Sequence, residues 1–279
     1  MTTSAPATEQ PLRTPPYDKS VLGKAHLLLG AFGPGTISLG LTELSQRSGV
    51  SKASTYRLAQ ELVHWGFLAR RGDNYQLGVR IFEMSQRVPL TVALRQIARP
   101  LLTDLFSTVH TSVNISILDG SEHILCVEKI AGRGNVLGEF QVGSRLPTSC
   151  SSSGKVLLAD WMAAHGGQLP QVPLPRLTAR SVCTPAALHR QLRTVQARGF
   201  AVEVGEVRAD CAGIAAPIVN YAGRAFAALS ATVPINRVDP ERLAPAVMSS
   251  AVAIGRLVDN WSMSHAPHAL TDPDDMIVA

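Results

Sequence analysis

The run of small polar residues from Ser149 to Lys155 has the residue types that could carry out chemistry. Ser152 and Lys155 are spaced as S-x-x-K, in which a lysine accompanies a nucleophilic serine. The S-D-N and K-T-G motifs that go with this pattern are absent, and the eight histidines of the chain form no recognisable motif. A serine-dependent hydrolase that uses Ser152 or Ser153 with Lys155 is therefore the alternative function, and no catalytic residue is assigned.

A different chemistry for the same run is the binding of an anion. The run is not a P-loop, because the first glycine is missing and Val156 stands where Ser or Thr would bind magnesium. We interpret it as a helix N-terminus whose free N–H groups favour an anion such as a carboxylate. An ordinary serine-capped helix without a ligand is the plainer interpretation. The sequence indicates no metal site and no cofactor.

Positive charge is concentrated in the first third of the chain. Nine basic and four acidic residues lie between Lys19 and Arg87, which accounts for the whole formal net charge of +5. A basic block beside a neutral remainder is typical of a chain in which one part meets a polyanion such as nucleic acid.

The elements that must position these charges follow from hydrophobic spacing. Apolar residues recur at helical intervals in three segments, and glycines mark where the segments end. The expected helices cover residues 25–32, 41–48 and 52–65, and two strand-like runs at 67–70 and 75–77 flank a turn at 72–74. Ser51 is expected to cap the third helix through its hydroxyl. This order is that of a winged helix-turn-helix.

In a winged helix-turn-helix, the N-terminal residues of the third helix enter the major groove and the wing reaches phosphates or the minor groove. Lys52 and Arg57 would meet phosphates or guanine edges. A helical hairpin with solvated charges is the alternative. The candidate DNA-binding residues are Lys52, Ser54, Thr55, Tyr56, Arg57, Arg70 and Arg71, with Ala53 on the same face.

The rest of the chain is expected to form an α+β domain with one antiparallel sheet flanked by helices. Expected helices lie at 92–109, 153–162, 185–198 and 239–257, and expected strands at 112–119, 123–130, 200–206, 213–219 and 224–232. The predicted division of the chain is a disordered arm 1–18, the winged domain 19–80, a linker helix 81–95 kinked at Pro89, the α+β domain 96–261 and a disordered tail 262–279.

Three blocks of sequence resemble one family in the same order along the chain. They are LTELSQRSGVSKASTYRLAQELVHWGFLARRGDNYQLGVRIFEM (41–84), GSRLPTSCSSSGKVLLA (143–159), and TARSVCTPAALHRQLRTVQARGFAVEVGEV (178–207) with IAAPI (214–218). The chain is identified by them as similar to the IclR (isocitrate lyase regulator) family of bacterial transcription factors. The resemblance implies a winged helix-turn-helix joined by a helix to a GAF- or profilin-like α/β effector-binding domain, in homodimers that often pair into homotetramers.

The resemblance also implies effector-binding positions. Small acids in this family touch the pair before Gly-Lys, a polar or acidic residue in the strand after the Arg-Gly-Phe-Ala run, and two alternating residues of a late strand. This chain departs from the family at Gly213, where cysteine is common, and at Asp210, where glycine is. The candidate effector residues are Ser152, Ser153, Glu203, Gly213, Ser230 and Thr232, with Val136, Leu137 and Phe140 as apolar walls or plain core.

Together these features predict a non-enzymatic transcriptional regulator, a repressor or an activator. A small-molecule effector, a carboxylate or an aromatic metabolite, would modulate its binding to a pseudo-palindromic operator in double-stranded DNA. A purely structural interaction module is a third interpretation, disfavoured by the localised charge. No apolar run is long enough to span a membrane and no signal peptide is evident, so a cytoplasmic protein is expected.

Overall fold

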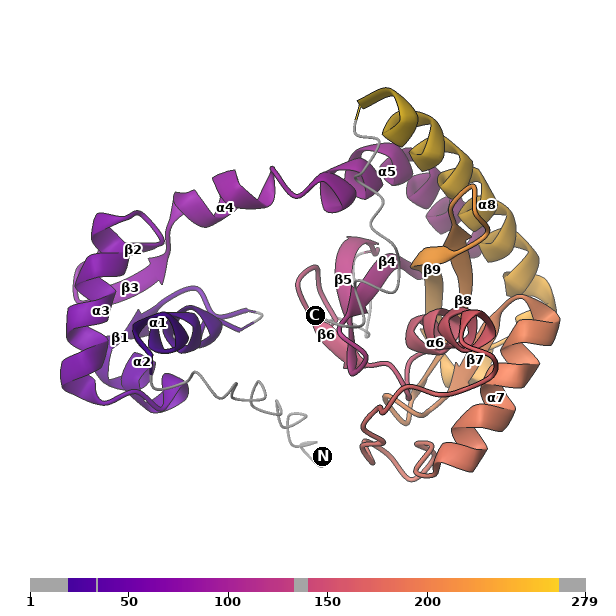
Figure 1. Cartoon of the computed structure of the whole chain (residues 1–279), viewed down its shortest axis with the longest axis horizontal. Coiled ribbons are helices and arrows are strands. Elements are labelled where there is room, and N and C mark those ends of the chain that lie inside the picture. Colours follow the sequence, from indigo (N-terminus) through magenta and orange to yellow (C-terminus); the bar gives the residue numbers. More distant parts are fainter. Residues whose placement is uncertain (1–19, 34, 133–139, 266–279) are drawn as a thin grey trace. The chain divides into compact units, whose positions relative to one another are not determined.

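The computed structural model describes residues 20–33, 35–132 and 140–265, and these fall into two compact units (Figure 1). The first unit ends at Arg87 and the second begins at Val88. The predicted arm 1–18 and the part of the predicted tail beyond His265 lie outside the described residues. Residues 262–265 belong instead to the last helix, which continues past the predicted end of the domain.

The first unit is the predicted winged helix-turn-helix. Three helices are followed by a hairpin whose second strand also pairs with a short strand between the first two helices. Its elements are α1 (Val21–Gly30), β1 (Leu39–Gly40), α2 (Leu41–Ser48), α3 (Lys52–His64), β2 (Leu68–Arg71), β3 (Asn74–Leu77) and α4 (Val79–Ser85).

The turn between α2 and α3 is fixed by a few local interactions. Gly49 ends α2 in the left-handed conformation, with φ of 68°, which an L side chain rarely adopts. The carbonyl oxygen of Val50 accepts hydrogen bonds from the hydroxyls of Ser45 at 2.7 Å and Thr55 at 3.1 Å. The predicted cap at Ser51 is wrong in its bonding, because this hydroxyl donates to the Ser54 hydroxyl and makes no bond to the backbone.

The predicted linker helix is instead interrupted. α4 ends at Ser85, and α5 (Pro89–Val109) begins with Pro89 at its first helical position. Proline has no N–H to donate and disfavours the helical conformation of the residue before it, and Val88 is extended, with φ of −84° and ψ of 102°. Pro89 therefore starts a helix where a kink within one was expected.

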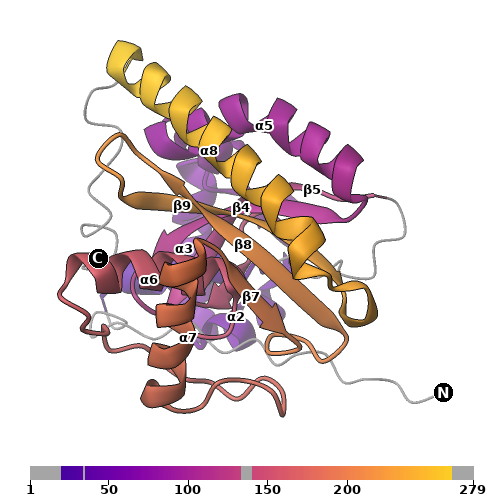
Figure 2. The same ribbon diagram turned by 90° about the vertical axis from the view of Figure 1, so that its right-hand side faces the viewer.

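The second unit is a six-stranded antiparallel sheet with the strand order β6-β5-β4-β9-β8-β7. Figure 2 shows α5 and α8 over one face of this sheet and α6 and α7 over the other. The bounds are β4 (Ser112–Asp119), β5 (His123–Ile130), β6 (Arg145–Pro147), α6 (Ser152–Ala164), α7 (Pro185–Arg198), β7 (Ala201–Val204), β8 (Cys211–Val219), β9 (Ala225–Pro234), a 3-10 turn (Ile235–Arg237) and α8 (Pro240–His265). The α+β prediction is confirmed.

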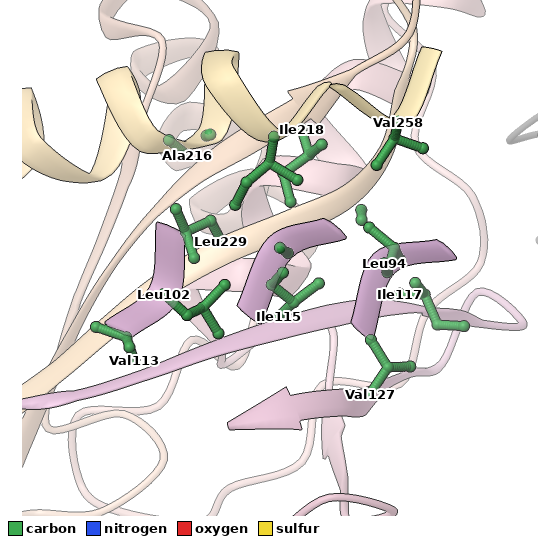
Figure 3. Close-up of a cluster of buried hydrophobic side chains, with 14 of the residues drawn as sticks. Leu94, Leu102, Val113, Ile115, Ile117, Val127, Ala216, Ile218, Leu229 and Val258 are labelled. Atoms are coloured by element: carbon green, nitrogen blue, oxygen red, sulfur yellow. The ribbon is translucent and has the colours of Figure 1, made fainter. Parts of the chain in front are cut away.

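Alternation along the strands separates an apolar face from a polar one. On β4, Val113, Ile115 and Ile117 point into a core shared with α5 and α8, where Leu102 and Val258 are fully buried (Figure 3). The residues between them therefore point to the face covered by α6. That face carries the candidate effector site.

Two short strands were not predicted from the sequence. β1 and β6 have two and three residues, too few for an alternating pattern to be recognised. Among the described helices, none is long and apolar enough to cross a membrane.

Truncating the core beneath α5 should destabilise the second unit. Leu102→Ala removes a fully buried side chain and leaves a cavity, so we expect a loss of about 2–5 kcal/mol. Leu257→Ala is the matched control, because this leucine of α8 is 46% exposed, and should cost less than about 1 kcal/mol. Thermal unfolding followed by circular dichroism measures both, and equal shifts in melting temperature would contradict this packing.

Candidate DNA-binding surface and effector site

The exposed side of α3 carries the predicted recognition residues. Lys52, Ala53, Tyr56 and Arg57 all face solvent at helical spacing, and Tyr56 is 53% exposed. The Arg57 Nη1 atom lies 3.1 Å from Glu61 Oε1, an exposed ion pair one turn apart that solvent screens. The helix thus presents two cations and a phenol on one face.

Thr55 was predicted to contact DNA, and the structure contradicts this. Its side chain is fully buried and its hydroxyl donates to Val50 within the turn. Thr55 shares the helix face of Leu58 and Leu62, which pack into the core of the unit. Ser54 is half-buried, and its hydroxyl accepts a hydrogen bond from Ser51.

The wing carries the two predicted arginines at the end of β2. Arg70 bends back on the turn, since its Nε donates to the carbonyl of Gly72 at 3.0 Å and its Nη2 lies 3.8 Å from Asp73 Oδ1. Arg71 is exposed. Both stay accessible to a polyanion.

Three predicted effector residues lie side by side on the polar face of the large sheet. In the strand register, Glu203 of β7 pairs with Gly213 of β8, and Gly213 pairs with Thr232 of β9. Ser230 belongs to the neighbouring row, opposite Asn114 of β4. Residues about 30 positions apart in sequence are thereby brought into one cluster.

Gly213 allows α6 to approach this cluster. A Cβ atom at position 213 would lie 2.7 Å from Ser152 Oγ and 3.3 Å from Glu203 Oε1. A side chain there would have to displace the serine, so glycine lets the start of α6 rest directly on the sheet. The structure therefore brings Ser152, Glu203 and Gly213 together, as the resemblance implied.

The N-terminus of α6 is capped from within the chain. The Ser151 hydroxyl accepts from the N–H of Gly154 at 3.1 Å, and its carbonyl accepts from the N–H of Lys155 at 3.0 Å. Ser152 and Ser153, both buried, are left to supply the first free N–H groups to an anion.

Lys155 is engaged in a buried ion pair. Its Nζ binds Glu206 Oε1, and the two residues are 1% and 5% exposed. The other carboxylate oxygen of Glu206 is buried without a hydrogen-bond partner. A lysine that activates a serine must be a free amine, so an ammonium held by a carboxylate does not support the hydrolase alternative.

Burial raises the pKa of the Glu203 carboxyl to about 7, because desolvation disfavours its charged form. The N–H of Glu206, which donates to Glu203 Oε2 at 2.9 Å, and the nearby Lys155 ammonium oppose that rise. Glu203 thus exchanges a proton near neutral pH, inside the candidate effector site.

Several polar residues of this site were missed by the sequence analysis. Asn114 and Ser116 of β4 are buried on the same face, and Asn114 Oδ1 accepts from Ser230 Oγ at 2.9 Å and from Ser116 Oγ at 3.3 Å. The signal was present as polar residues at alternate positions of a strand otherwise made of Val, Ile and Leu.

The predicted apolar walls Val136 and Leu137 lie outside the described residues. Phe140 is half-buried and packs against the apolar cluster beneath α6. Within the described residues, no three His, Cys, Asp or Glu side chains gather as a metal site would require.

A winged helix-turn-helix with an exposed basic recognition helix, followed by a domain with a buried polar cluster, defines a ligand-responsive transcriptional regulator. Comparison with known families agrees: residues 21–72 match the IclR helix-turn-helix domain, and residues 86–258 match the C-terminal domain of the bacterial transcriptional regulator IclR. The chain belongs to the IclR family of bacterial transcriptional regulators.

Individual relatives agree with this assignment. The chain is 29% identical to the transcriptional regulator XynR of Escherichia coli, covering 79% of this chain and 88% of XynR, and 30% identical to E. coli KdgR, covering 74% and 79%. A solved IclR homologue from Microbacterium hydrocarbonoxydans, complexed with 4-hydroxybenzoate, superposes with a TM-score of 0.76 at 26% identity and covers 86% of this chain and all of that one.

Glu203 should make the stability of the protein depend on pH. The unfolded chain releases this proton near pH 4.5, and the folded protein holds it to about pH 7, so the contribution of Glu203 is most favourable below 4.5 and falls as the pH rises through 7. Glu203→Gln, which retains an acceptor for the Glu206 N–H, should therefore raise the melting temperature more at pH 8 than at pH 5.

Glu241→Gln removes an exposed charge from the same domain and is the control. Melting curves at both pH values measure the difference from wild type. An increment for Glu203→Gln that is the same at pH 5 and pH 8 would contradict a buried, weakly acidic carboxyl.

Proposed function

We propose that this regulator reads its operator through Lys52, Ser54, Tyr56 and Arg57 of α3, with Arg70 and Arg71 of the wing at phosphates. The observation that carries this proposal is the exposure of a basic helix face whose opposite side packs into the core. Long cations beside a phenol suit both guanine edges and the DNA backbone. Such a protein would act in the cytoplasm, where its operator lies.

We further propose that the effector is a carboxylate or aromatic acid bound over the polar face of the sheet, at Ser152, Ser153, Glu203, Gly213, Ser230 and Thr232. The serine hydroxyls and the Glu203 carboxyl are buried on one face of the sheet, where they can still donate to or accept from a ligand, and this supports the proposal. The complex of the Microbacterium homologue with 4-hydroxybenzoate supports an aromatic acid. Val136 and Leu137 remain proposed as apolar walls.

A homodimer, or a tetramer built from dimers, is proposed as the DNA-binding form because two recognition helices would read the two halves of a pseudo-palindrome. A groove of about 620 Å³ between the wing and α4 supports this, since Leu77, Val79 and Phe82 line it and expose apolar surface. Apolar patches of this kind mark association surfaces.

No enzymatic activity is proposed. The engagement of Lys155 with Glu206 supports this, as do the relatives, which are regulators. The hydrolase alternative would be supported if a fluorophosphonate probe labelled the wild-type protein and the Ser152→Ala substitution abolished this labelling.

Arg57→Ala tests the DNA-binding face. We expect the binding free energy for the operator to weaken by about 1–3 kcal/mol. If Arg57 contacts a phosphate, the affinity for every DNA sequence should fall. If it contacts a guanine, the loss should appear as relaxed specificity at one base pair. A mobility shift with the DNA upstream of its own gene and excess competitor measures this. Arg256→Ala, an exposed arginine of α8, is the control. Unchanged affinity of the Arg57 variant would refute the assignment.

Phe82→Glu tests the proposed association surface. A charge placed in the apolar groove should weaken self-association and convert oligomer to monomer, as measured by light scattering, while each unit stays folded. Glu83→Gln, on the same helix, should leave the mass unchanged. A monomeric wild-type protein would exclude this role for the groove.

A further inference from the structure

The polar face of the sheet has a cation at one end and a carboxyl at the other. In the strand register, Lys129 of β5 pairs with Asn114 of β4, and Asn114 pairs with Ser230 of β9. Lys129 therefore belongs to the same face as the effector residues, with Glu203 four strands away on β7. A basic group and an acidic group therefore lie at the two ends of the site, along the direction perpendicular to the strands.

Lys129 is a half-buried cation without a carboxylate. Its Nζ donates to the carbonyl oxygen of Phe140 at 2.6 Å, and within the described part of the chain it makes no ion pair. Burial lowers the pKa of the Lys129 ammonium, because desolvation disfavours its charged form. Lys155, which is fully buried, has a glutamate partner.

Asn114 next to it has a free donor. Its Oδ1 accepts from two hydroxyls, those of Ser230 and Ser116, which fixes the orientation of the amide. In the described part of the chain both hydrogen bonds of the Asn114 side chain go to Oδ1, and Nδ2 makes none. A ligand with an acceptor group could therefore take a hydrogen bond from this amide N–H₂.

The opposite end of the face repels an anion. Glu203 there is close to Glu206, whose second carboxylate oxygen is buried and without a partner. The Lys155 ammonium balances one of these two acids, so once Glu203 has lost its proton a net negative charge remains that disfavours a ligand carboxylate, whereas a hydroxyl or amine could donate to Glu203. The charges thus favour an acid at the Lys129 end and a donor at the Glu203 end.

We infer that the effector is a bifunctional acid whose carboxylate binds the Lys129 ammonium and the Asn114 amide, and whose far end donates a hydrogen bond to Glu203. This rests on the proposed effector site, and it moves the carboxylate away from the N-terminus of α6. With strands about 4.8 Å apart, the backbones of β5 and β7 lie on the order of 19 Å apart. A ligand that reaches both ends must therefore be longer than a two-carbon acid.

The test is calorimetric titration of the full chain with four probes: 4-hydroxybenzoate, 4-hydroxybenzamide, benzoate and phenol. The acid with the hydroxyl should bind most tightly. Lys129→Met should weaken it about ten- to a hundredfold and remove the preference for acid over amide, and Lys129→Arg should restore that preference.

Two further variants separate the ends of the ligand. Asn114→Asp keeps the acceptor for Ser230 and Ser116 but replaces the donor, so acids should bind at least about tenfold more weakly, with melting curves confirming the fold. Glu203→Gln should change the affinity of 4-hydroxybenzoate and leave that of benzoate unchanged.

The inference is overturned if Lys129→Met and Asn114→Asp bind the acid as wild type does, or if Glu203→Gln strengthens the binding of both acids equally, which would place the carboxylate at Glu203. It is also overturned if no probe binds the wild type. A mobility shift on the same preparations tests DNA binding separately: a protein that binds operator but no probe retains the proposed regulator and loses this effector class.

Discussion

The contact between the start of α6 and the sheet is the constraint on which the second domain depends. Ser152 rests on Gly213, where a Cβ atom would force its hydroxyl to move, and Lys155 one turn later is paired with Glu206 beyond the end of β7. Removing either partner would leave an uncompensated buried charge, so the pair fixes where α6 lies relative to the end of β7. Because α6 is fixed there, its serines and the carboxyl of Glu203 occupy one small volume.

The two faces of the same sheet have different roles, one in the stability of the domain and the other in the proposed recognition of a ligand. Its face toward α5 and α8 is filled by Val, Ile and Leu, while the face toward α6 carries Asn114, Ser230 and Glu203. A strand alternates its side chains, so the same residues that build the core necessarily present their neighbours to the site. Burying so many polar groups opposes folding, and the apolar face offsets that cost.

Regulation in this chain would rest on different physics in its two units. The exposed cations of α3 attract DNA phosphates through solvent and are screened by salt, so they suit a salt-dependent encounter with DNA. The acids and hydroxyls over the large sheet are shielded from water, where each hydrogen bond and charge discriminates strongly among ligands. An effector can change DNA binding only through its different affinity for different states of the protein.

The sequence by itself determined most of the elements and the family resemblance. Helical and alternating periodicity located α2, β4, β5 and α7 closely, since hydrophobic spacing and the glycines at 49 and 199 act locally. Position in space was decided only by tertiary structure. Thr55 is polar like the residues beside it, yet its side chain lies in the core. Asn114 and Lys129 come together only because strands β5, β4 and β9 are adjacent in the sheet. Such adjacency depends on strand pairing between distant segments, which local residue patterns do not encode.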